Sequence, residues 1–243
     1  MEEVEGFIVS EVSYGDASKI INVFTKDGVV GLIAKGAKSL KSNLRVNTTK
    51  FTYGKFMINR KKDKLSNLLE VSVIDELKNI KQDLKLISYL SYMVELTNQI
   101  LKQTYEYEEL YNLFINIVLK LNDKLNPKVL CNIYEIKVLD YLGVGINFNS
   151  CTKCGSTNNI VTIDGDIGGY ICKNCYTNEI IYDNKTIKML RMYYLIDVST
   201  ISSLKISNNV IENINLFINT YYDRYTGLYL NSKKFLKDLD KIY

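Results

Sequence analysis

Two C-x₂-C pairs decide how the second half of this chain folds: Cys151-Thr152-Lys153-Cys154 and, after seventeen intervening residues, Cys172-Lys173-Asn174-Cys175. This is the spacing of a tetrahedral metal site closed by four thiolates. Glycines beside both pairs, at Gly155 and at Gly168-Gly169, permit the tight turns that aim two sulfurs at one ion. We therefore expect a zinc ribbon in which Cys151, Cys154, Cys172 and Cys175 bind one structural zinc ion.

Two other interpretations of the cysteines stay open, namely two disulfides or four reduced thiols without a metal. The chain contains no histidine, so a mixed Cys/His site is excluded, and four thiolates leave no open position for a catalytic water. The total of five cysteines is odd, and no apolar signal segment follows Met1-Glu2-Glu3, which argues against a secreted disulfide protein. The fifth cysteine, Cys131, falls on a predicted helix and is expected in the core.

The composition is that of an ordinary globular protein. The 243 residues are enough to bury a substantial core, and the hydrophobic share of 47% and the charged share of 24% are usual values. No apolar run approaches the length of a membrane span, about 18 residues, and no secretory segment is visible. We expect a soluble cytoplasmic protein that does not bind membranes.

No pattern in the sequence is typical of an enzyme. Without histidine there is no Ser-His-Asp or Cys-His arrangement. Asp164 and Asp166 come nearest to paired carboxylates, but they fall in a glycine-containing turn between the cysteine pairs, and a solvated turn is the simpler interpretation. Gly143-Val144-Gly145 follows a predicted helix rather than a strand, so it does not suit a phosphate cradle. We expect no catalytic residues.

Residues 1–78 are predicted to form a β domain. Short runs rich in Val, Ile, Phe and Leu are separated by turn signals such as Tyr14-Gly15-Asp16 and Lys26-Asp27-Gly28. Five such strands favour a small barrel of the oligonucleotide-binding (OB) type, which binds its ligands on strands 2 and 3 and on the neighbouring loops. The predicted strands are Phe7–Val12, Lys19–Thr25, Val29–Ala34, Thr52–Asn59 and Leu68–Ile74.

Positive charge is concentrated in one part of this domain. The net charge of the chain is only +4, but residues 35–64 carry +9 and the remainder −5. Phe51, Tyr53 and Phe56 lie in the same segment, and basic residues interleaved with aromatic ones are typical of a groove for single-stranded nucleic acid. The alternative is that the lysines form a solvated face and the aromatic side chains belong to the barrel core.

Helical spacing replaces the β pattern after Asp75. We expect residues 79–147 to form the first part of a helical domain, residues 148–178 the ribbon, and residues 179–243 the second part. The helices on either side of the ribbon are expected to pack together, so the ribbon is an insertion. The fold class is therefore α+β multidomain: an N-terminal five-stranded OB-fold β-barrel, then an α-helical domain with an inserted four-cysteine zinc ribbon.

Several helix ends have explicit signals. Asn126 suits an N-cap, Pro127 the first helical position, and Gly143 the left-handed residue that ends a helix. Gly227 is expected to close a helix over Ile211–Tyr225 in the same way. Further helices are predicted to contain Leu86 to Leu101, Leu110 to Leu121, Ile187 to Ile196, and a last one capped by Ser232 with Phe235, Leu236 and Leu239. On the helix after Pro127, one apolar face is predicted, made of Leu130, Ile133, Tyr134, Val138, Tyr141 and Leu142.

The order of these features resembles the RecO family of bacterial recombination mediators. The N-terminal similarity lies in Glu5-Gly6-Phe7-Ile8-Val9, Phe24-Thr25-Lys26-Asp27-Gly28 and above all Ala34-Lys35-Gly36-Ala37-Lys38. Leu142-Gly143 before the first cysteine pair and Gly168-Gly169 before the second are also similar, and the resemblance covers nearly the whole chain. One departure is Val144-Gly145-Ile146-Asn147, where the family often has a proline, and another is the absence of proline or arginine near Leu40.

The resemblance implies a non-enzymatic role in DNA repair and recombination that needs no ATP. Such a protein binds single-stranded DNA, and duplex DNA more weakly, anneals complementary strands, and acts with RecR to load RecA on DNA coated by single-stranded-DNA-binding protein (SSB). The resemblance also implies a nucleoid-associated cytoplasmic protein whose helical domain takes the acidic, phenylalanine-ended tail of SSB in an apolar pocket rimmed with lysine.

The resemblance also implies roles for residues of the basic segment. Phe51 and Tyr53 are candidate stacking platforms for bases. The implied phosphate contacts are Lys35, Lys38, Lys41 and Arg45, flanked by Lys50, Lys55, Arg60, Lys61 and Lys62.

Two other functions stay open. One is a zinc-ribbon and OB-fold module that binds RNA or takes part in transcription. The other is a helical adaptor whose basic segment only adds solubility.

Overall fold

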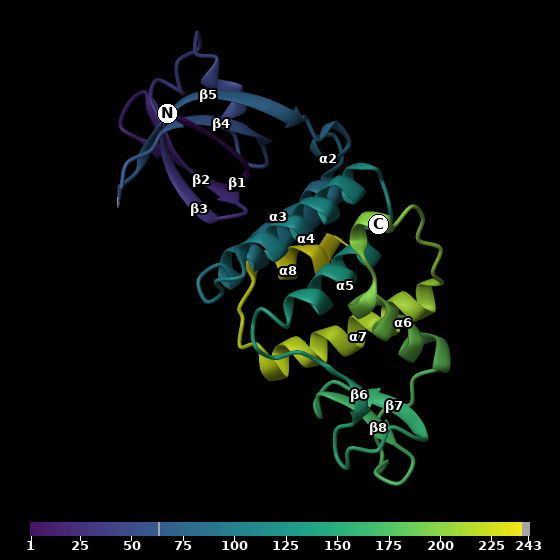
Figure 1. Cartoon of the computed structure of the whole chain (residues 1–243). Coiled ribbons are helices and arrows are strands. Elements are labelled where there is room, and N and C mark those ends of the chain that lie inside the picture. Colours follow the sequence, from purple (N-terminus) through teal and green to yellow (C-terminus); the bar gives the residue numbers. More distant parts are fainter. Residues whose placement is uncertain (63, 240–243) are drawn as a thin grey trace. The chain divides into compact units, whose positions relative to one another are not determined.

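The computed structural model describes residues 1–62 and 64–239 of the chain (Figure 1). The chain forms two compact units, one made of residues 1–87 and 104–115 and the other of residues 88–103 and the chain from 116 onward. The domain boundaries expected after residues 78, 147 and 178 stay predictions. Among the described residues, no helix combines the length and the apolarity that crossing a bilayer requires.

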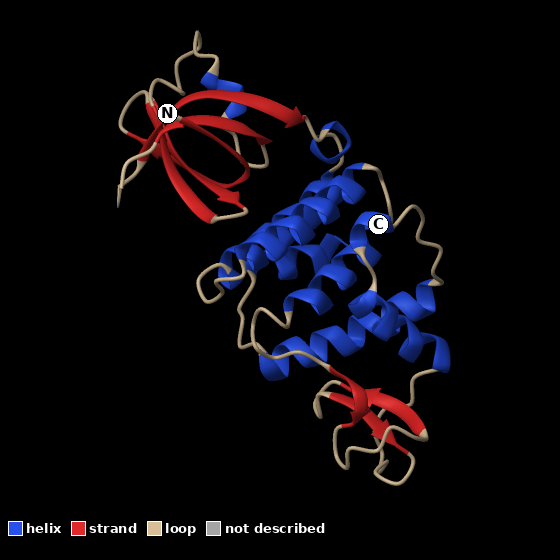
Figure 2. Ribbon diagram, in the orientation of Figure 1, coloured by secondary structure: helices blue, strands red, loops and turns tan. Residues whose placement is uncertain are grey.

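The first unit is built on a closed five-stranded barrel, as predicted. Its strands pair in the order β1-β2-β3-β5-β4, and β3 and β5 are the parallel neighbours. In Figure 2 these strands form the upper red group. The strands are β1 (Glu2–Tyr14), β2 (Ser18–Thr25), β3 (Gly28–Ala34), β4 (Tyr53–Asn59) and β5 (Ser66–Asp75).

Strand β1 begins at Glu2, well before the apolar run that starts at Phe7. Its first half pairs with β4, from Glu2 opposite Ile58 to Phe7 opposite Tyr53, and its second half pairs with β2. Closure of the barrel therefore extends a strand that local sequence predicts as shorter, because polar residues gain a backbone partner on β4.

The barrel core is apolar and tightly closed. A Cβ atom on Gly6 would lie 2.4 Å from Cγ1 of Val23, so only glycine allows β1 to approach β2 this closely. Buried side chains fill the barrel: Ile8, Ile21, Val23, Leu32, Ala34, Ala37, Phe56, Ile58, Leu68 and Val71. Phe7 and Phe24 pack instead against helix α4 (Tyr107–Asn122), with the Phe7 and Phe114 rings 5.0 Å apart and edge to face.

Two short helices flank the strands of the barrel. The loop of residues 35–43 leaves β3 and leads into α1 (Leu44–Asn47), and α2 (Lys78–Lys81) follows β5. The loop is attached to the β1–β2 turn, because the backbone N–H of Lys38 donates to the carbonyl of Ala17 at 2.9 Å. It is therefore a structured part of the barrel surface.

The second unit is helical around a central helix, α5 (Pro127–Val138). The side chain of Asn126 accepts from the backbone N–H groups of Lys128 and Val129, which confirms the predicted N-cap. Gly143 has φ +70°, but the helix ends at Val138, so the prediction that Gly143 ends it is wrong, and Tyr141, Leu142 and Gly143 lie in the turns that follow. The other helices are α3 (Leu84–Ile100), α6 (Asn184–Leu195), a 3-10 turn (Val198–Thr200), α7 (Asn208–Tyr225) and α8 (Asn231–Leu239).

Helix α5 differs from the prediction of a single apolar face. Nearly every residue from Val129 to Val138 is buried, including the polar residues Asn132 and Glu135. Since α6 and α7 both pack on α5, in addition to the helices before it, the helix has almost no solvent-facing side. Cys131 is buried, as expected.

The start of helix α8 also differs from the prediction that Ser232 is its cap. The helix begins at Asn231, and the carboxylate of Glu95 on α3 accepts from the backbone N–H groups of Asn231 at 3.0 Å and Ser232 at 2.9 Å. A side chain far away in the sequence thus satisfies the N–H groups that a local cap usually satisfies. On this helix Leu236 is buried and Phe235 is half exposed, while the predicted apolar side chain of Leu239 lies outside the described residues.

The cysteine segment forms a separate small sheet between α5 and α6. Its strands are β6 (Asn147–Cys151), β7 (Ile160–Asp164) and β8 (Gly169–Cys172), in the order β6-β8-β7. Figure 2 shows it as the smaller, lower red group. Because α5, α6 and α7 pack on one another, the predicted insertion of a cysteine-rich module into a helical domain is confirmed.

Candidate metal centre and nucleic-acid interface

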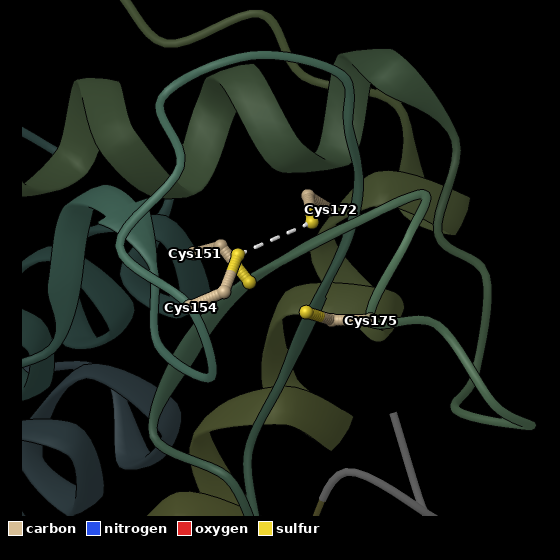
Figure 3. Close-up of side chains that lie close together, drawn as sticks. All are labelled: Cys151, Cys154, Cys172 and Cys175. Carbon is tan, nitrogen blue, oxygen red and sulfur yellow. Dashed lines mark hydrogen bonds between the residues drawn. The ribbon is translucent and has the colours of Figure 1, made fainter.

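The four paired cysteines converge on one point. Their Sγ atoms all lie within 4.8 Å of one another, and Figure 3 shows the side chains pointing toward a common centre. Cys151 ends β6 and Cys172 ends β8, while Cys154 and Cys175 lie in the turns that follow. The sheet therefore holds one cysteine of each pair and the following turn aims the other.

The arrangement fits a tetrahedral metal ion. Zinc–sulfur bonds of about 2.3 Å place the sulfurs of a tetrahedron about 3.8 Å apart. The Sγ atoms of Cys154 and Cys172 are 3.7 Å apart, and all four residues are free cysteines. A disulfide needs sulfurs about 2.05 Å apart. The donor set is thus four thiols at metal-binding distance, the arrangement that the sequence predicts.

Backbone hydrogen bonds shape both turns of the cluster. The N–H of Gly155 donates to the carbonyl of Cys151 at 2.8 Å, and the N–H of Cys175 donates to the carbonyl of Cys172 at 3.0 Å. Gly155 has φ +76°, which favours glycine. In each pair, the turn brings the sulfur of the second cysteine close to that of the first.

The cluster favours thiolate at one position before any metal binds. Burial alone raises the pKa of the Cys151 thiol, but backbone N–H groups of Cys172, Cys154 and Lys153 donate to its sulfur and bring the pKa below its usual value. Hydrogen bonds with neighbouring sulfurs, first that of Cys154, raise the pKa of Cys175. A divalent cation held by the four sulfurs would instead favour the thiolate form of each cysteine.

Helices α6 and α7 hold the ribbon in place. The hydroxyl of Tyr221 donates to the carbonyls of Val144 at 3.0 Å and Gly145 at 3.1 Å, in the segment that departs from the resembled family. The hydroxyl of Tyr225 donates to the carbonyl of Asp166 at 2.7 Å. The ring of Phe148 lies 5.3 Å from that of Tyr194 on α6. These hydrogen bonds and the ring contact attach the ribbon to α6 and α7.

Asp164 has the turn role expected for it. Its Oδ1 atom accepts from the backbone N–H groups of Asp166 at 2.9 Å and Ile167 at 2.8 Å. This carboxylate closes an Asx turn between β7 and β8.

The basic residues occupy several parts of the barrel surface. Lys35, Lys38 and Lys41 lie on the loop after β3, and Arg45 lies on α1. Lys61 and Lys62 lie between β4 and β5. Leu32, near the end of β3, lies opposite Ser66, the first residue of β5. The basic residues thus come from two segments of the barrel surface, the loop with α1 and the β4–β5 connection.

Some of these cations are already engaged. Lys55 pairs with Glu3 at 3.1 Å, and Arg60 pairs with Glu2, so β1 neutralises both. The Nζ atom of Lys38 donates to the carbonyl of Gly15 at 2.9 Å. Lys50 lies 4.8 Å from the ring centre of Phe51. Among the implied phosphate contacts, the exposed cations for which the described residues supply no ion pair are Lys35, Lys41, Arg45, Lys61 and Lys62.

Phe51 and Tyr53 do not present their rings to solvent, so the stacking role considered for them is wrong. Phe51 is 8% exposed and Tyr53 is 7% exposed. The Tyr53 hydroxyl donates to Glu5 at 2.6 Å, and burial raises the pKa of this tyrosine. Phe56 belongs to the barrel core. The alternative interpretation, that these are strand and core residues, holds.

The helical unit contains a polar pocket that the sequence does not single out. It encloses 130 Å³ and is lined by residues of α3, α5, α7 and α8. Asn132 is 1% exposed, and its Nδ2 atom has no hydrogen-bond partner among the described residues. Beside it, Lys233 of α8 pairs with the buried Glu135 at 3.1 Å. The signal in the sequence is two polar residues, Asn132 and Glu135, within the otherwise apolar stretch from Val129 to Ile136.

A five-stranded OB-type barrel followed by helices with an inserted four-cysteine ribbon defines the class of this protein: a multidomain OB-fold protein with a cluster of four cysteines that could hold a metal ion. Comparison with known families identifies which one. The family model "Recombination protein O N terminal" matches residues 1–77, and "Recombination protein O C terminal" matches residues 81–234.

Similar proteins agree over the full length. "DNA repair protein RecO" of Listeria innocua is 31% identical over 245 residues, which is 99% of this chain and 96% of the relative. The proteins of the same name from Halalkalibacterium halodurans and Bacillus cereus are each 30% identical over 244 residues, covering 99% of this chain and 96% and 98% of the relatives. The chain belongs to the RecO family of DNA repair proteins.

Proposed function

We propose that this protein is a non-enzymatic recombination mediator. It binds single-stranded DNA, and duplex DNA more weakly, anneals complementary strands, and acts with RecR to help load RecA onto SSB-coated DNA. Membership of the RecO family supports this proposal, and the observation that carries it is the basic loop and helix on the surface of an OB-type barrel. The protein acts on chromosomal DNA in the cytoplasm.

The DNA contacts are phosphate contacts. Lys35, Lys41 and Arg45 are exposed on the loop after β3 and on α1, where a DNA backbone releases counterions as it binds. Lys61 and Lys62 extend the field on the β4–β5 connection. Lys38 holds the loop to the β1–β2 turn, and Lys50, Lys55 and Arg60 contribute less because nearby groups already engage them.

The four-cysteine centre holds one zinc ion with a structural role. Four thiolates complete a tetrahedral shell, so the ion has no position for a reacting water or a DNA group. Cys151, Cys154, Cys172 and Cys175 would be the ligands, and the ion would join the β6 and β8 ends of the ribbon. No other cofactor is needed for strand annealing.

The pocket of the helical unit supports binding of the SSB tail. Its volume of 130 Å³ suits a single aromatic ring, since a cavity of about 150 Å³ accepts benzene. Tyr89, Tyr92 and Leu236 supply apolar surface. Lys128, Lys233 and the Asn132 amide, whose Nδ2 atom has no partner among the described residues, supply donors for a carboxylate. An acidic peptide that ends in phenylalanine offers both groups.

Strand annealing with and without SSB is the decisive test. Complementary oligomers, one carrying a fluorophore and the other a quencher, should anneal faster with this protein, both bare and SSB-coated, and no ATP should be required. Binding without annealing would favour the alternative of an RNA-binding or transcription-associated module. Tighter binding of RNA than of DNA oligomers of equal length would support the same alternative. If the protein binds no oligomer, the remaining alternative is a helical adaptor whose basic segment only adds solubility.

A further inference from the structure

A groove in the first unit lies beside the basic loop but outside the residues that charge alone selects. It is formed by α1 on one side and by the end of β5 and α2 on the other. Its volume is 370 Å³, within the range of roughly 300–1,000 Å³ typical of sites for small molecules. A nucleotide of a longer strand is of suitable size for it.

The groove has an apolar surface that is open to solvent. Val46 is 74% exposed and Val73 is 38% exposed, and both line the groove. The neighbouring Leu44 is partly buried against the barrel core, so the short helix α1 turns Leu44 toward the barrel and leaves Val46 exposed. An exposed apolar wall of this kind suits the face of a nucleobase, which loses water when it stacks.

Amide side chains stand next to this apolar wall. Asn47 and Gln82 line the groove, and each amide offers both donors and an acceptor, as the edges of bases do. The Nδ2 atom of Asn47 donates to the carbonyl of Val71 at 3.5 Å, which orients the side chain in the wall. The groove therefore combines a flat apolar contact with hydrogen-bonding groups.

The charge of the groove favours an anionic strand. Two lysines line it against one acid, and Lys78 already pairs with that acid, Glu76, at 2.9 Å. Lys81 makes no ion pair with a described residue, and burial lowers the pKa of its ammonium group, which an added anion would oppose. Arg45 precedes Val46 in α1, so the proposed phosphate contacts lead directly to the groove.

We propose that this groove binds one base of a single DNA strand, with Val46 against the base, the amides of Asn47 and Gln82 along its edge, and Lys81 near the adjoining phosphate. The inference rests on the proposed function and extends the DNA site from the basic loop to α2. It adds Val46 and Lys81 to the interface, two residues that the charge count does not identify.

A tryptophan reporter tests the base contact directly, because the chain has no tryptophan. Val46→Trp places an indole in the groove, and Tyr105→Trp places one on a side chain that is 89% exposed and outside the groove. Upon titration with an oligothymidylate, excited where tyrosine absorbs little, the Val46→Trp emission should be quenched in step with binding measured by anisotropy. The Tyr105→Trp emission should stay constant.

A charge pair of variants tests the phosphate contact. Lys81→Glu should weaken oligothymidylate binding about fivefold and flatten the salt dependence by about 0.7 in log–log slope, the value for one phosphate on a single strand. Lys26→Glu makes an equal charge change on the exposed β2–β3 turn and should change the affinity and the salt slope much less.

The outcomes separate the inference from the function on which it rests. If the wild-type protein binds the oligomer but Val46→Trp keeps constant emission and Lys81→Glu matches Lys26→Glu, the groove is not part of the interface. If the wild-type protein binds no oligomer, the proposed function itself is wrong, and the inference falls with it.

Discussion

The four clustered cysteines differ in their surroundings, although their sulfurs converge on one point. Cys151 and Cys172 are buried at strand ends, Cys175 is half-buried and Cys154 is exposed. Loss of a buried ligand removes a thiolate and leaves a strand end without its anchor. Cys131 is buried in α5, away from the cluster in the ribbon, and its Sγ atom lies 3.9 Å from Glu135.

Replacing Cys172 with Ser should abolish zinc binding and destabilise the ribbon, because metal binding and local folding are coupled. Cys131→Ser is the matched control and should keep the wild-type zinc content. Elemental analysis of protein purified without added metal measures both, with one zinc per wild-type chain expected. A wild-type protein that is folded and free of metal would contradict the prediction.

Changing Lys35, Lys41 and Arg45 together to Glu should weaken binding to all single-stranded sequences alike, since phosphate contacts carry no base information. The slope of log K against log salt should flatten by about 2 for three lost contacts. Lys38 is left in place because it holds the loop to Gly15. Fluorescence anisotropy over a salt series measures the effect.

The control for this variant is Lys55→Glu, in which the lost lysine is already paired with Glu3. We expect Lys55→Glu to change the slope of log K against log salt by less than one third of the change in the triple variant. Wild-type affinity and slope in a folded triple variant would place the DNA site elsewhere.

At the scale of elements, the ends of helices show how distant parts of the chain complete one another. Local residues cap α5, where Asn126 and Pro127 are adjacent in sequence. Helix α8 instead depends on Glu95 of α3, whose carboxylate meets the positive end of the helix. The attachment of α8 is therefore a long-range contact.

Glu95→Ala should lower the free energy of unfolding by about 1–2 kcal/mol, because two backbone N–H groups lose their acceptor and the helix dipole loses its anion. Glu212→Ala on α7, an exposed glutamate, should cost much less. Urea unfolding followed by circular dichroism compares the two variants. Equal midpoints would mean that water replaces Glu95 at no cost.

At the scale of the whole molecule, the barrel and the ribbon have separate sources of stability. The barrel has its own buried apolar cluster, whereas the ribbon is a small sheet that carries the four clustered cysteines and contacts α6 and α7. Small domains of this size usually need a structural metal to fold.

Removal of the metal with a strong chelator should therefore loosen the ribbon and spare the barrel. Backbone hydrogen exchange measured by mass spectrometry should speed up in β6, β7 and β8 and stay slow in the inner strands of the barrel. Oligomer binding should fall less than in the Lys35, Lys41 and Arg45 variant. An equal or larger loss would place the ribbon in the DNA interface.

The sequence by itself determined the features that depend on neighbours along the chain. The cysteine spacing predicted the four-thiol cluster, the alternation of apolar runs and turns predicted five strands, and Asn126 marked the start of a helix. These signals are reliable because turn geometry, strand periodicity and capping act over a few residues.

Only the tertiary structure decided features that depend on which distant groups meet. It buried Phe51 and Tyr53, paired Lys55 and Arg60 with β1, and surrounded α5 so that Asn132 lines a pocket. It also brought α1 and α2 together around one groove. A charge count cannot reveal such pairings, because burial and ion pairing are set by the closure of the barrel and the packing of helices, not by local order in the chain.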